Sequence, residues 1–324
     1  MNGSHGPFTL TRPRLDQRLA GSGHRRLTCV VAGAGFGKTT LLTAWAATAT
    51  TSAWHSLTSG DRALGVLVRA VTDALRARVP GLPGDLVAAV SGPRGPDTGT
   101  DEAGRAQAYA GRICEALAYR QPRDLVLVLD DVEAIDGAPE SVAFVAGLCR
   151  QAPATLHVVL SSRRDPPFPV ARLRGQGQVL DLSASDLAFT PEETAQVVRA
   201  AVGQDAGPDL ATGLQELTGG WPAAVRLAAE ALAHDPSGNA EAALARLRRP
   251  GGVLHDYLVA EVVGAESAET QDLLARLAVL DRFTPDLAEA LGPAGSAGSC
   301  ARITSTMPST RGSVAWSPYF STSA

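Results

Sequence analysis

Residues 27–40 read LTCVVAGAGFGKTT, and this stretch decides the fold. The run LTCVV at 27–31 is apolar and β-branched, which predicts a buried strand. A glycine-rich loop follows, and the sequence from Thr39 to Ala49 predicts a helix. A strand, a glycine-rich loop and a helix in this order form the setting of a phosphate-binding loop, or P-loop.

The loop matches the P-loop pattern GxxxxGK followed by Ser or Thr, except that Ala32 stands at the first glycine position. Glycines give the backbone the angles that turn its amides toward a β-phosphate, and the N-terminus of the next helix adds further amides. We expect Lys38 to bridge the β- and γ-phosphates and the Thr39 hydroxyl to ligate Mg²⁺. The residues predicted to bind ATP or ADP here are Gly33, Ala34, Gly35, Phe36, Gly37, Lys38, Thr39 and Thr40.

Lys38 is the only lysine in the chain, since arginine stands at every other position that carries one of these two residues. Lysine presents a slim point charge on a flexible stem, whereas the wide guanidinium group of arginine would not fit inside the same loop. Its survival at this position alone indicates that the site requires it. The alternative is a glycine-rich turn that happens to contain a lysine, and the strand and helix around the loop argue against it.

An acidic pair follows the strongest strand signal of the chain, LVLVL at 125–129. At the carboxyl end of such a strand, Asp130 is expected to hold Mg²⁺ through water. Asp131 is then placed to polarise an attacking water molecule as a general base. The alternative is that the two residues only cap the strand and begin a turn.

Arg163 follows another predicted strand, residues 156–160. From there it could reach a γ-phosphate and distinguish ATP from ADP through a charge-assisted contact. A solvated loop arginine is the alternative, and Arg164 beside it could exchange roles with it. Asp131 and Arg163 are therefore the predicted catalytic residues, whereas His157 is expected to be a packed neutral histidine within the strand.

Strands alternate with helices up to about residue 184, and further strands are predicted at 52–57 and 178–182. This alternation predicts an α/β fold, a P-loop NTPase whose parallel sheet is flanked by helices. The remaining pattern is helical and begins with Thr190 as N-cap, Pro191 at the first helical position and Glu193 completing a capping box.

Composition narrows the function classes. The chain has 324 residues and a formal net charge of −4, which argues against a protein that mainly binds nucleic acid. It has neither a signal-peptide core nor an apolar run long enough to span a bilayer, so we expect a cytoplasmic protein without membrane contact. Its four cysteines are scattered and do not suggest a metal site.

A series of motifs resembles the large ATP-binding LuxR-type regulators, the MalT-like group of the STAND signalling ATPases. The motifs are TRPRL at 11–15, VAGAGFGKTTLL at 31–42 with Trp45, LVLDD at 127–131, SRRDPP at 162–167, ARLR at 171–174, DLAFT at 186–190, LTGGWP at 217–222 and DYL at 256–258. They follow one another in the order of the family and cover residues 10 to about 291.

This resemblance implies a nucleotide-operated switch with slow ATPase activity. In the family, the module is closed around ADP in the resting state, and inducer together with ATP would open it into a self-associating form. Pro222 would pack on the nucleotide, Arg12 to Leu15 would lie near the adenine, and Arg163 would sense the γ-phosphate. The implied domains are an N-terminal segment at 1–26, an NTPase core at 27–184, a helical subdomain at 185–250, a partial winged-helix subdomain at 251–291 and a poorly ordered Ser/Thr-rich tail at 292–324.

The chain departs from this family toward its end. Neither a helical-repeat sensor nor a helix-turn-helix that binds DNA is visible, which predicts a truncated regulator, with a reading-frame shift near residue 292. The rival interpretation is a P-loop kinase or another ATP-dependent enzyme that acts on a small substrate. Such an enzyme needs specificity and acid–base residues outside the phosphate site, and the sequence suggests none. A third reading is a remnant that binds nucleotide but neither senses an inducer nor binds DNA.

Overall fold

The computed structural model divides the chain into two compact units. The α/β unit comprises residues within 13–32 and 38–183, and the helical unit comprises residues within 1–12, 33–37 and 184–324. The structure describes residues 10–21, 25–48, 51–83, 102–120, 124–203, 207–233, 240–247, 252–264, 268–277, 282–283, 285–292 and 314–315.

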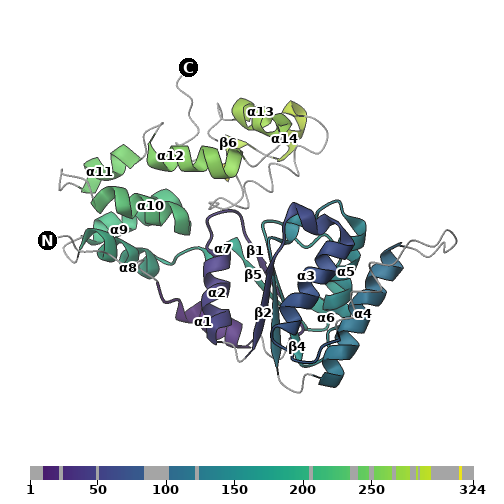
Figure 1. Ribbon diagram of the computed structural model, residues 1–324. Helices are drawn as coiled ribbons and strands as arrows, with labels where there is room; N and C mark the ends of the chain where they lie inside the picture. The colour runs from purple at the N-terminus through teal and green to yellow at the C-terminus, as the bar shows by residue number, and fades with distance from the viewer. Residues whose placement is uncertain are drawn as a thin grey trace. The chain divides into compact units, whose positions relative to one another are not determined.

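A parallel five-stranded sheet forms the centre of the α/β unit (Figure 1). Its strands are β1 (Leu27–Val31), β2 (Ser52–Ser56), β3 (Leu125–Asp130), β4 (Leu156–Ser162) and β5 (Val179–Ser183). They stand in the order β2-β3-β4-β1-β5, and every neighbouring pair is parallel. The predicted parallel sheet is confirmed, and each strand begins and ends within two residues of its predicted place.

Helices cover both faces of this sheet, with α2 on one side and α3, α4 and α5 on the other (Figure 1). The helices of the α/β unit are α1 (Pro13–Ala20), α2 (Lys38–Thr48), α3 (Leu64–Arg76), α4 (Glu102–Arg120), α5 (Pro139–Gln151) and α6 (Ala171–Gly175). Two short 3₁₀ turns, η2 (Ser59–Arg62) and η5 (Val132–Ile135), follow β2 and β3. Since both sheet faces are covered, the central strands are apolar on both sides.

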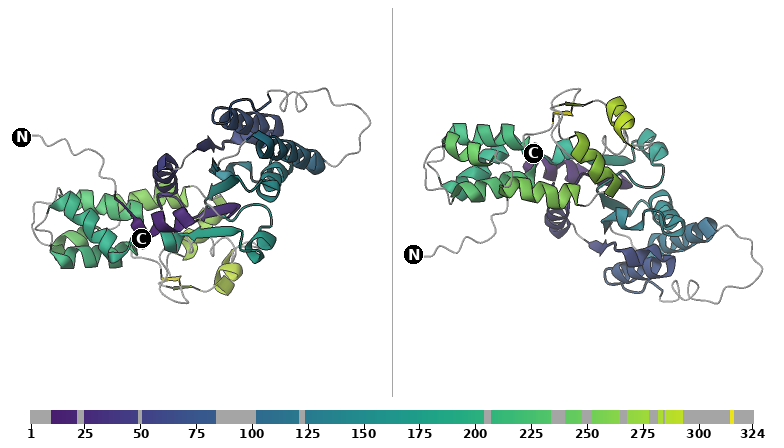
Figure 2. Two further views of the ribbon diagram at one scale, coloured as in Figure 1. Left: turned by 90° about the horizontal axis from the view of Figure 1, so that it is seen from below. Right: turned by 90° about the horizontal axis from the view of Figure 1, so that it is seen from above.

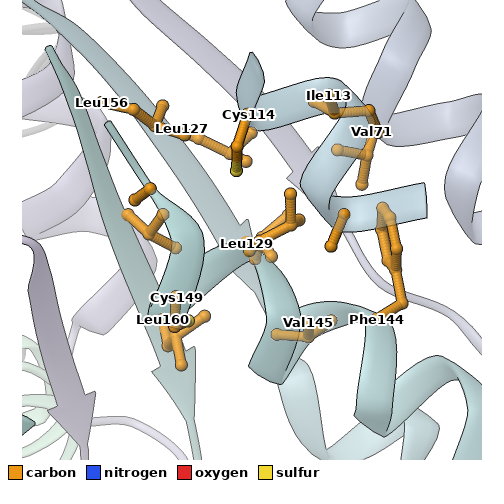
Figure 3. Packing of buried hydrophobic residues seen from close by; sticks show 14 of the residues in the cluster. Val71, Ile113, Cys114, Leu127, Leu129, Phe144, Val145, Cys149, Leu156 and Leu160 are labelled. Atoms are coloured by element: carbon orange, nitrogen blue, oxygen red, sulfur yellow. The ribbon is translucent and has the colours of Figure 1, made fainter. Parts of the chain in front are cut away.

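Alternate residues of β3 show how the core is divided. Leu127 and Leu129 pack with Phe144 and Val145 of α5 and with residues of α3 and α4 (Figure 3). On the opposite face, the ring of His157 in β4 lies edge-on to Trp45 of α2, with 6.3 Å between the ring centroids. The packed histidine predicted within this strand is therefore observed.

The helical unit consists of short helices that pack on one another, and Figure 2 shows α8, α9 and α10 side by side (green). Its elements are α7 (Ala184–Leu187), α8 (Pro191–Val202), α9 (Pro208–Thr218), α10 (Pro222–Ala233), α11 (Ala240–Leu247), α12 (Val253–Leu258), the π-helical turn η6 (Val259–Val263), α13 (Ala268–Leu277), α14 (Pro285–Leu291) and the antiparallel pair β6 (Arg282–Phe283) and β7 (Val314–Ala315). At the start of α8, Thr190 and Glu193 form the predicted capping box.

Several predictions fall largely beyond the residues that the structure describes. Nearly all of the tail at 292–324 lies outside them, and the partial winged-helix subdomain stays a prediction. Among the helices that are described, none is both long enough and apolar enough to cross a bilayer.

Candidate nucleotide-binding site

The backbone of the glycine-rich loop explains its residue choices. Gly35 and Gly37 have φ angles of 73° and 76°, in the left-handed region that favours glycine. Asp131 is the one non-glycine residue with a positive φ angle in the described part of the chain, so Ala32 has an ordinary backbone conformation. Alanine at the first position of the motif therefore causes no strain.

Lys38 begins α2 and is buried, with 8% of its surface exposed. Its Nζ atom donates a hydrogen bond to the carbonyl oxygen of Ala32 over 2.7 Å. Burial lowers the pKa of Lys38, and the nearby negative charges, Glu133 first among them, act in the opposite direction. A buried ammonium group at the mouth of a glycine-rich loop is suited to binding an anion.

Thr39 and Asp130 meet at the carboxyl edge of the sheet. The Thr39 hydroxyl donates a hydrogen bond to Oδ2 of Asp130 over 2.8 Å, although the two residues lie 91 positions apart in the sequence. Asp130 is the last residue of β3, and 1% of its surface is exposed. The α/β unit therefore brings together the two residues predicted to hold Mg²⁺.

The donor atoms at this point fit a magnesium ion. A hydroxyl and a carboxylate are hard oxygen ligands of the kind that Mg²⁺ prefers, and Mg²⁺ commonly takes its other ligands from phosphates and water. Within the described ranges there is no group of three or more His, Cys, Asp or Glu side chains that could hold a metal ion by itself. A magnesium ion here would therefore depend on the nucleotide for part of its coordination.

Asp131 stands in a strained turn directly after the strand, with a φ angle of 56°. Aspartate tolerates the left-handed region better than most residues, and strained conformations often occur at functional sites. Burial raises the pKa of its carboxyl group, and the charges of Asp130 and Glu133 add to this effect. A carboxylate with a raised pKa is a stronger base, which suits the role predicted for it.

Glu133, in the turn η5, is a site residue that the sequence analysis missed. Its Oε2 atom accepts hydrogen bonds from the Ser162 hydroxyl, over 3.0 Å, and from the backbone N–H of Arg163, over 3.1 Å. Its Oε1 atom lies 3.3 Å from Nε of Arg163. The available signal was the position of a third carboxylate two residues after Asp131 at the same edge of the sheet. Arg164 turns to a different partner, since its Nη1 atom lies 3.9 Å from Asp136.

In the helical unit, the residues around Pro222 hold the glycine-rich loop by its carbonyl groups. The Trp221 indole donates a hydrogen bond to the Ala34 oxygen over 3.0 Å, and the Ala223 amide donates one to the Gly35 oxygen over 3.1 Å. Pro222 is buried between these two donors at the first position of α10. Pro222 therefore lies between two residues that bind the loop, and its contact with the nucleotide stays a prediction.

Side chains also crowd the loop at Gly35. A Cβ atom on Gly35 would lie 2.7 Å from Cβ of Ala223 and 2.9 Å from the Tyr257 hydroxyl. Phe36 adds an aromatic contact, with 6.4 Å between its ring centroid and that of Trp221. Gly35 is therefore required both by its backbone angle and by close packing.

Arg12, which the family resemblance links to the adenine, is engaged with the helical unit. Its Nη2 atom donates hydrogen bonds to the Leu187 oxygen over 2.7 Å and to Oε2 of Glu193 over 3.1 Å. Its guanidinium group lies 4.9 Å from the centroid of the Phe189 ring. The segment before α1 is thereby anchored to the start of α8.

Comparison of the sequence with known protein families identifies a match that includes residues of this site. Residues 10–161 match the family described as the AAA ATPase domain. The matched residues include Lys38, Thr39, Asp130, Asp131 and Glu133.

The chain is also similar to transcriptional regulators. The chain is 30% identical over 282 residues, or 84% of its length, to the HTH-type transcriptional regulator MalT of Cronobacter sakazakii. It is 29% identical over 280 residues to MalT of Klebsiella pneumoniae. The chain spans 29% of the length of these relatives. The resemblance to MalT-like regulators predicted from the motifs is confirmed.

The P-loop fold itself is shared with a solved structure. A Walker-type ATPase of Pyrococcus abyssi superimposes on this chain with a TM-score of 0.53. The superposition covers 96% of this chain and 95% of that protein. The two sequences are 12% identical, so the likeness concerns the fold alone.

Proposed function

We propose that this chain is the ATP- and ADP-binding switch of a LuxR-type, MalT-like regulator of the STAND class, with slow ATPase activity. The observation that carries the proposal is the hydrogen bond from Thr39 to Asp130, formed where α2 begins with the buried Lys38. These residues come from two distant parts of the sequence and supply the charges and oxygen ligands that a magnesium–nucleotide complex needs.

Each residue of the phosphate site has a distinct role in this proposal. Lys38 leaves the Ala32 carbonyl and binds the β- and γ-phosphates, while the loop amides from Gly33 to Gly37 and the Thr40 amide bind phosphate oxygens. Thr39 and Asp130 would hold Mg²⁺, Asp130 through water. Mg²⁺, when bound, offsets the negative charge of the phosphate oxygens.

Hydrolysis in this proposal depends on Asp131 and Arg163. Asp131 accepts a proton from the attacking water, which its raised pKa favours. Arg163 contacts the γ-phosphate and so makes the ATP complex different from the ADP complex. A ligand shifts a conformational equilibrium only through such differential contacts, which is the basis of a switch.

The grip of the helical unit on the glycine-rich loop supports a switch over a simple hydrolase. Trp221 and Ala223 bind loop carbonyls, and Pro222 between them would pack against the nucleotide. In the proposed cycle ADP favours the closed state, whereas ATP releases a form that self-associates. We assign no inducer binding or DNA binding to this chain, and both functions would belong to the part of the longer relatives that the chain does not match.

Two measurements test this function. Isothermal titration calorimetry with ATP and ADP should show binding that depends on Mg²⁺, and Lys38→Ala should abolish it. Product analysis should show ADP and inorganic phosphate formed at a slow rate, without a phosphorylated metabolite. A phosphorylated small molecule would favour the kinase alternative, and the absence of any nucleotide affinity would refute the site itself.

A further inference from the structure

Glu133 binds Arg163 in a way that leaves the arginine free to act on a ligand. The carboxylate is held in place by the Ser162 hydroxyl and by the Arg163 backbone N–H, both of which donate to Oε2. Its other oxygen, Oε1, remains for the guanidinium group, at 3.3 Å from Nε. Two donors at the end of β4 thus fix the carboxylate without any contribution from the Arg163 guanidinium group.

The contact uses one side of the guanidinium group. Among the residues that the structure describes, Nη1 and Nη2 of Arg163 donate no hydrogen bond. The Arg163 side chain is 44% exposed, whereas that of Glu133 is 20% exposed. A planar guanidinium group that is anchored through Nε can still present its two Nη atoms to the oxygens of a phosphate.

Glu133 also lies within electrostatic reach of the phosphate site. Burial lowers the pKa of Lys38, and among the charges that oppose this effect Glu133 contributes most. Glu133 also helps to raise the pKa of Asp131. The fixed carboxylate and the half-exposed arginine therefore stand at the carboxyl edge of the sheet, where β3 ends at Asp130.

We propose that Glu133 is the positioning residue of the Arg163 sensor and that it sets the preference of this chain for ATP over ADP. Without the carboxylate, the exposed arginine samples many rotamers, and the entropy of ordering it must be offset when the γ-phosphate binds. With the carboxylate, part of that ordering precedes binding. The inference rests on the proposed role of Arg163 and deepens it.

A double-mutant cycle tests this inference with ATP and ADP as ligands in the presence of Mg²⁺. We expect Arg163→Ala to weaken ATP binding about tenfold, the scale of one charge-assisted hydrogen bond, and to leave ADP affinity within about twofold. Glu133→Ala should weaken ATP binding in the same direction by several-fold, again without a change for ADP. The double variant should be no worse than Arg163→Ala alone, since Glu133 acts through the arginine.

Two further variants separate positioning from folding. Glu133→Gln keeps an oxygen acceptor for Ser162 and the Arg163 amide but removes the charge, and we expect it to lower ATP affinity while the unfolding temperature stays unchanged. Glu102→Ala is the matched control, because it breaks an Arg105 ion pair of 3.7 Å on α4. It should leave the affinities for both nucleotides unaltered.

The outcomes are distinct. Equal losses for ATP and ADP in both Glu133 variants would mean a structural role, and tighter ATP binding would mean that the carboxylate competes with the γ-phosphate. Either result overturns the inference and leaves the nucleotide switch intact. If the wild-type chain binds neither ATP nor ADP, the proposed function fails with it.

Discussion

Replacing Thr39 by valine tests the magnesium site most directly. Valine has nearly the same shape but lacks the hydroxyl that donates to Oδ2 of Asp130 over 2.8 Å. Asp130 then retains the hydrogen bond that the Asp131 amide donates to Oδ1 over 3.1 Å. Because Thr39 itself is exposed, water can replace part of the lost contact, and we expect the free energy of unfolding to fall by about 1 kcal/mol.

The effect on magnesium–nucleotide binding should be larger than the effect on stability. The substitution removes an oxygen ligand and also the hydrogen bond that orients Asp130, and losses of this kind cost about tenfold to a hundredfold in metal affinity. Calorimetric titrations of ATP with Mg²⁺ and with EDTA measure this directly. The ratio of the two affinities should shrink in Thr39→Val.

Two variants control this experiment. Thr39→Ser keeps the hydroxyl and should retain most of the magnesium dependence. Thr43→Val makes the same chemical change one turn later on α2, at an exposed position, and should behave as the wild type does. If Thr39→Val keeps the full magnesium dependence, Thr39 is not a ligand, and the assignment of the metal site to this hydroxyl and Asp130 is wrong.

Three other predictions concern separate parts of the molecule. Trp221→Phe keeps the aromatic packing but loses the hydrogen bond to the Ala34 oxygen. We expect nucleotide affinity to fall about fivefold, which corresponds to about 1 kcal/mol for one hydrogen bond. Trp54→Phe loses an exposed indole hydrogen bond and is the control, and equal effects in both variants would contradict the role of Trp221. Burial lowers the pKa of His157 from its ordinary value of 6.5, so its neutral form contributes stability that is present above this pH and is lost as the pH falls through the folded-state pKa. Urea unfolding from pH 7.5 to about 5 should show this loss, and His157→Gln should flatten it; an unchanged slope would exclude His157 as the cause. Asp131→Asn keeps a residue that tolerates the left-handed region, so we expect ATP to bind while hydrolysis slows by about a hundredfold. If this variant releases ADP at the wild-type rate, Asp131 is not the general base.

Much of the fold and part of the site followed from the sequence because the signals were local. The apolar run at 125–129 is long enough to define a buried strand, and the acidic pair at its end stands where parallel strands present their carboxyl edge. The capping box of Thr190 and Glu193 was readable because both partners lie within one helical turn.

The contacts that escaped sequence reasoning are of a different kind. Glu133 lies after a backbone reversal at Asp131, and no pattern of the sequence reports that its side chain turns back toward Ser162 and Arg163. The hydrogen bond from Trp221 to Ala34 joins residues 187 positions apart. Such pairs depend on how the chain folds over long distances, and a single sequence contains no periodic signal for them.

The hydrogen bonds that Trp221 and Ala223 donate to the glycine-rich loop have a geometric consequence. A peptide group is planar and trans, so its oxygen and its amide hydrogen point in opposite directions. By fixing the Ala34 oxygen, the indole also fixes the direction of the Gly35 N–H, and the Ala223 amide does the same for the N–H of Phe36. Any displacement of the first turn of α10 therefore rotates these two peptide planes and changes where their dipoles aim, so the affinity of the loop for anions becomes a property of helix position.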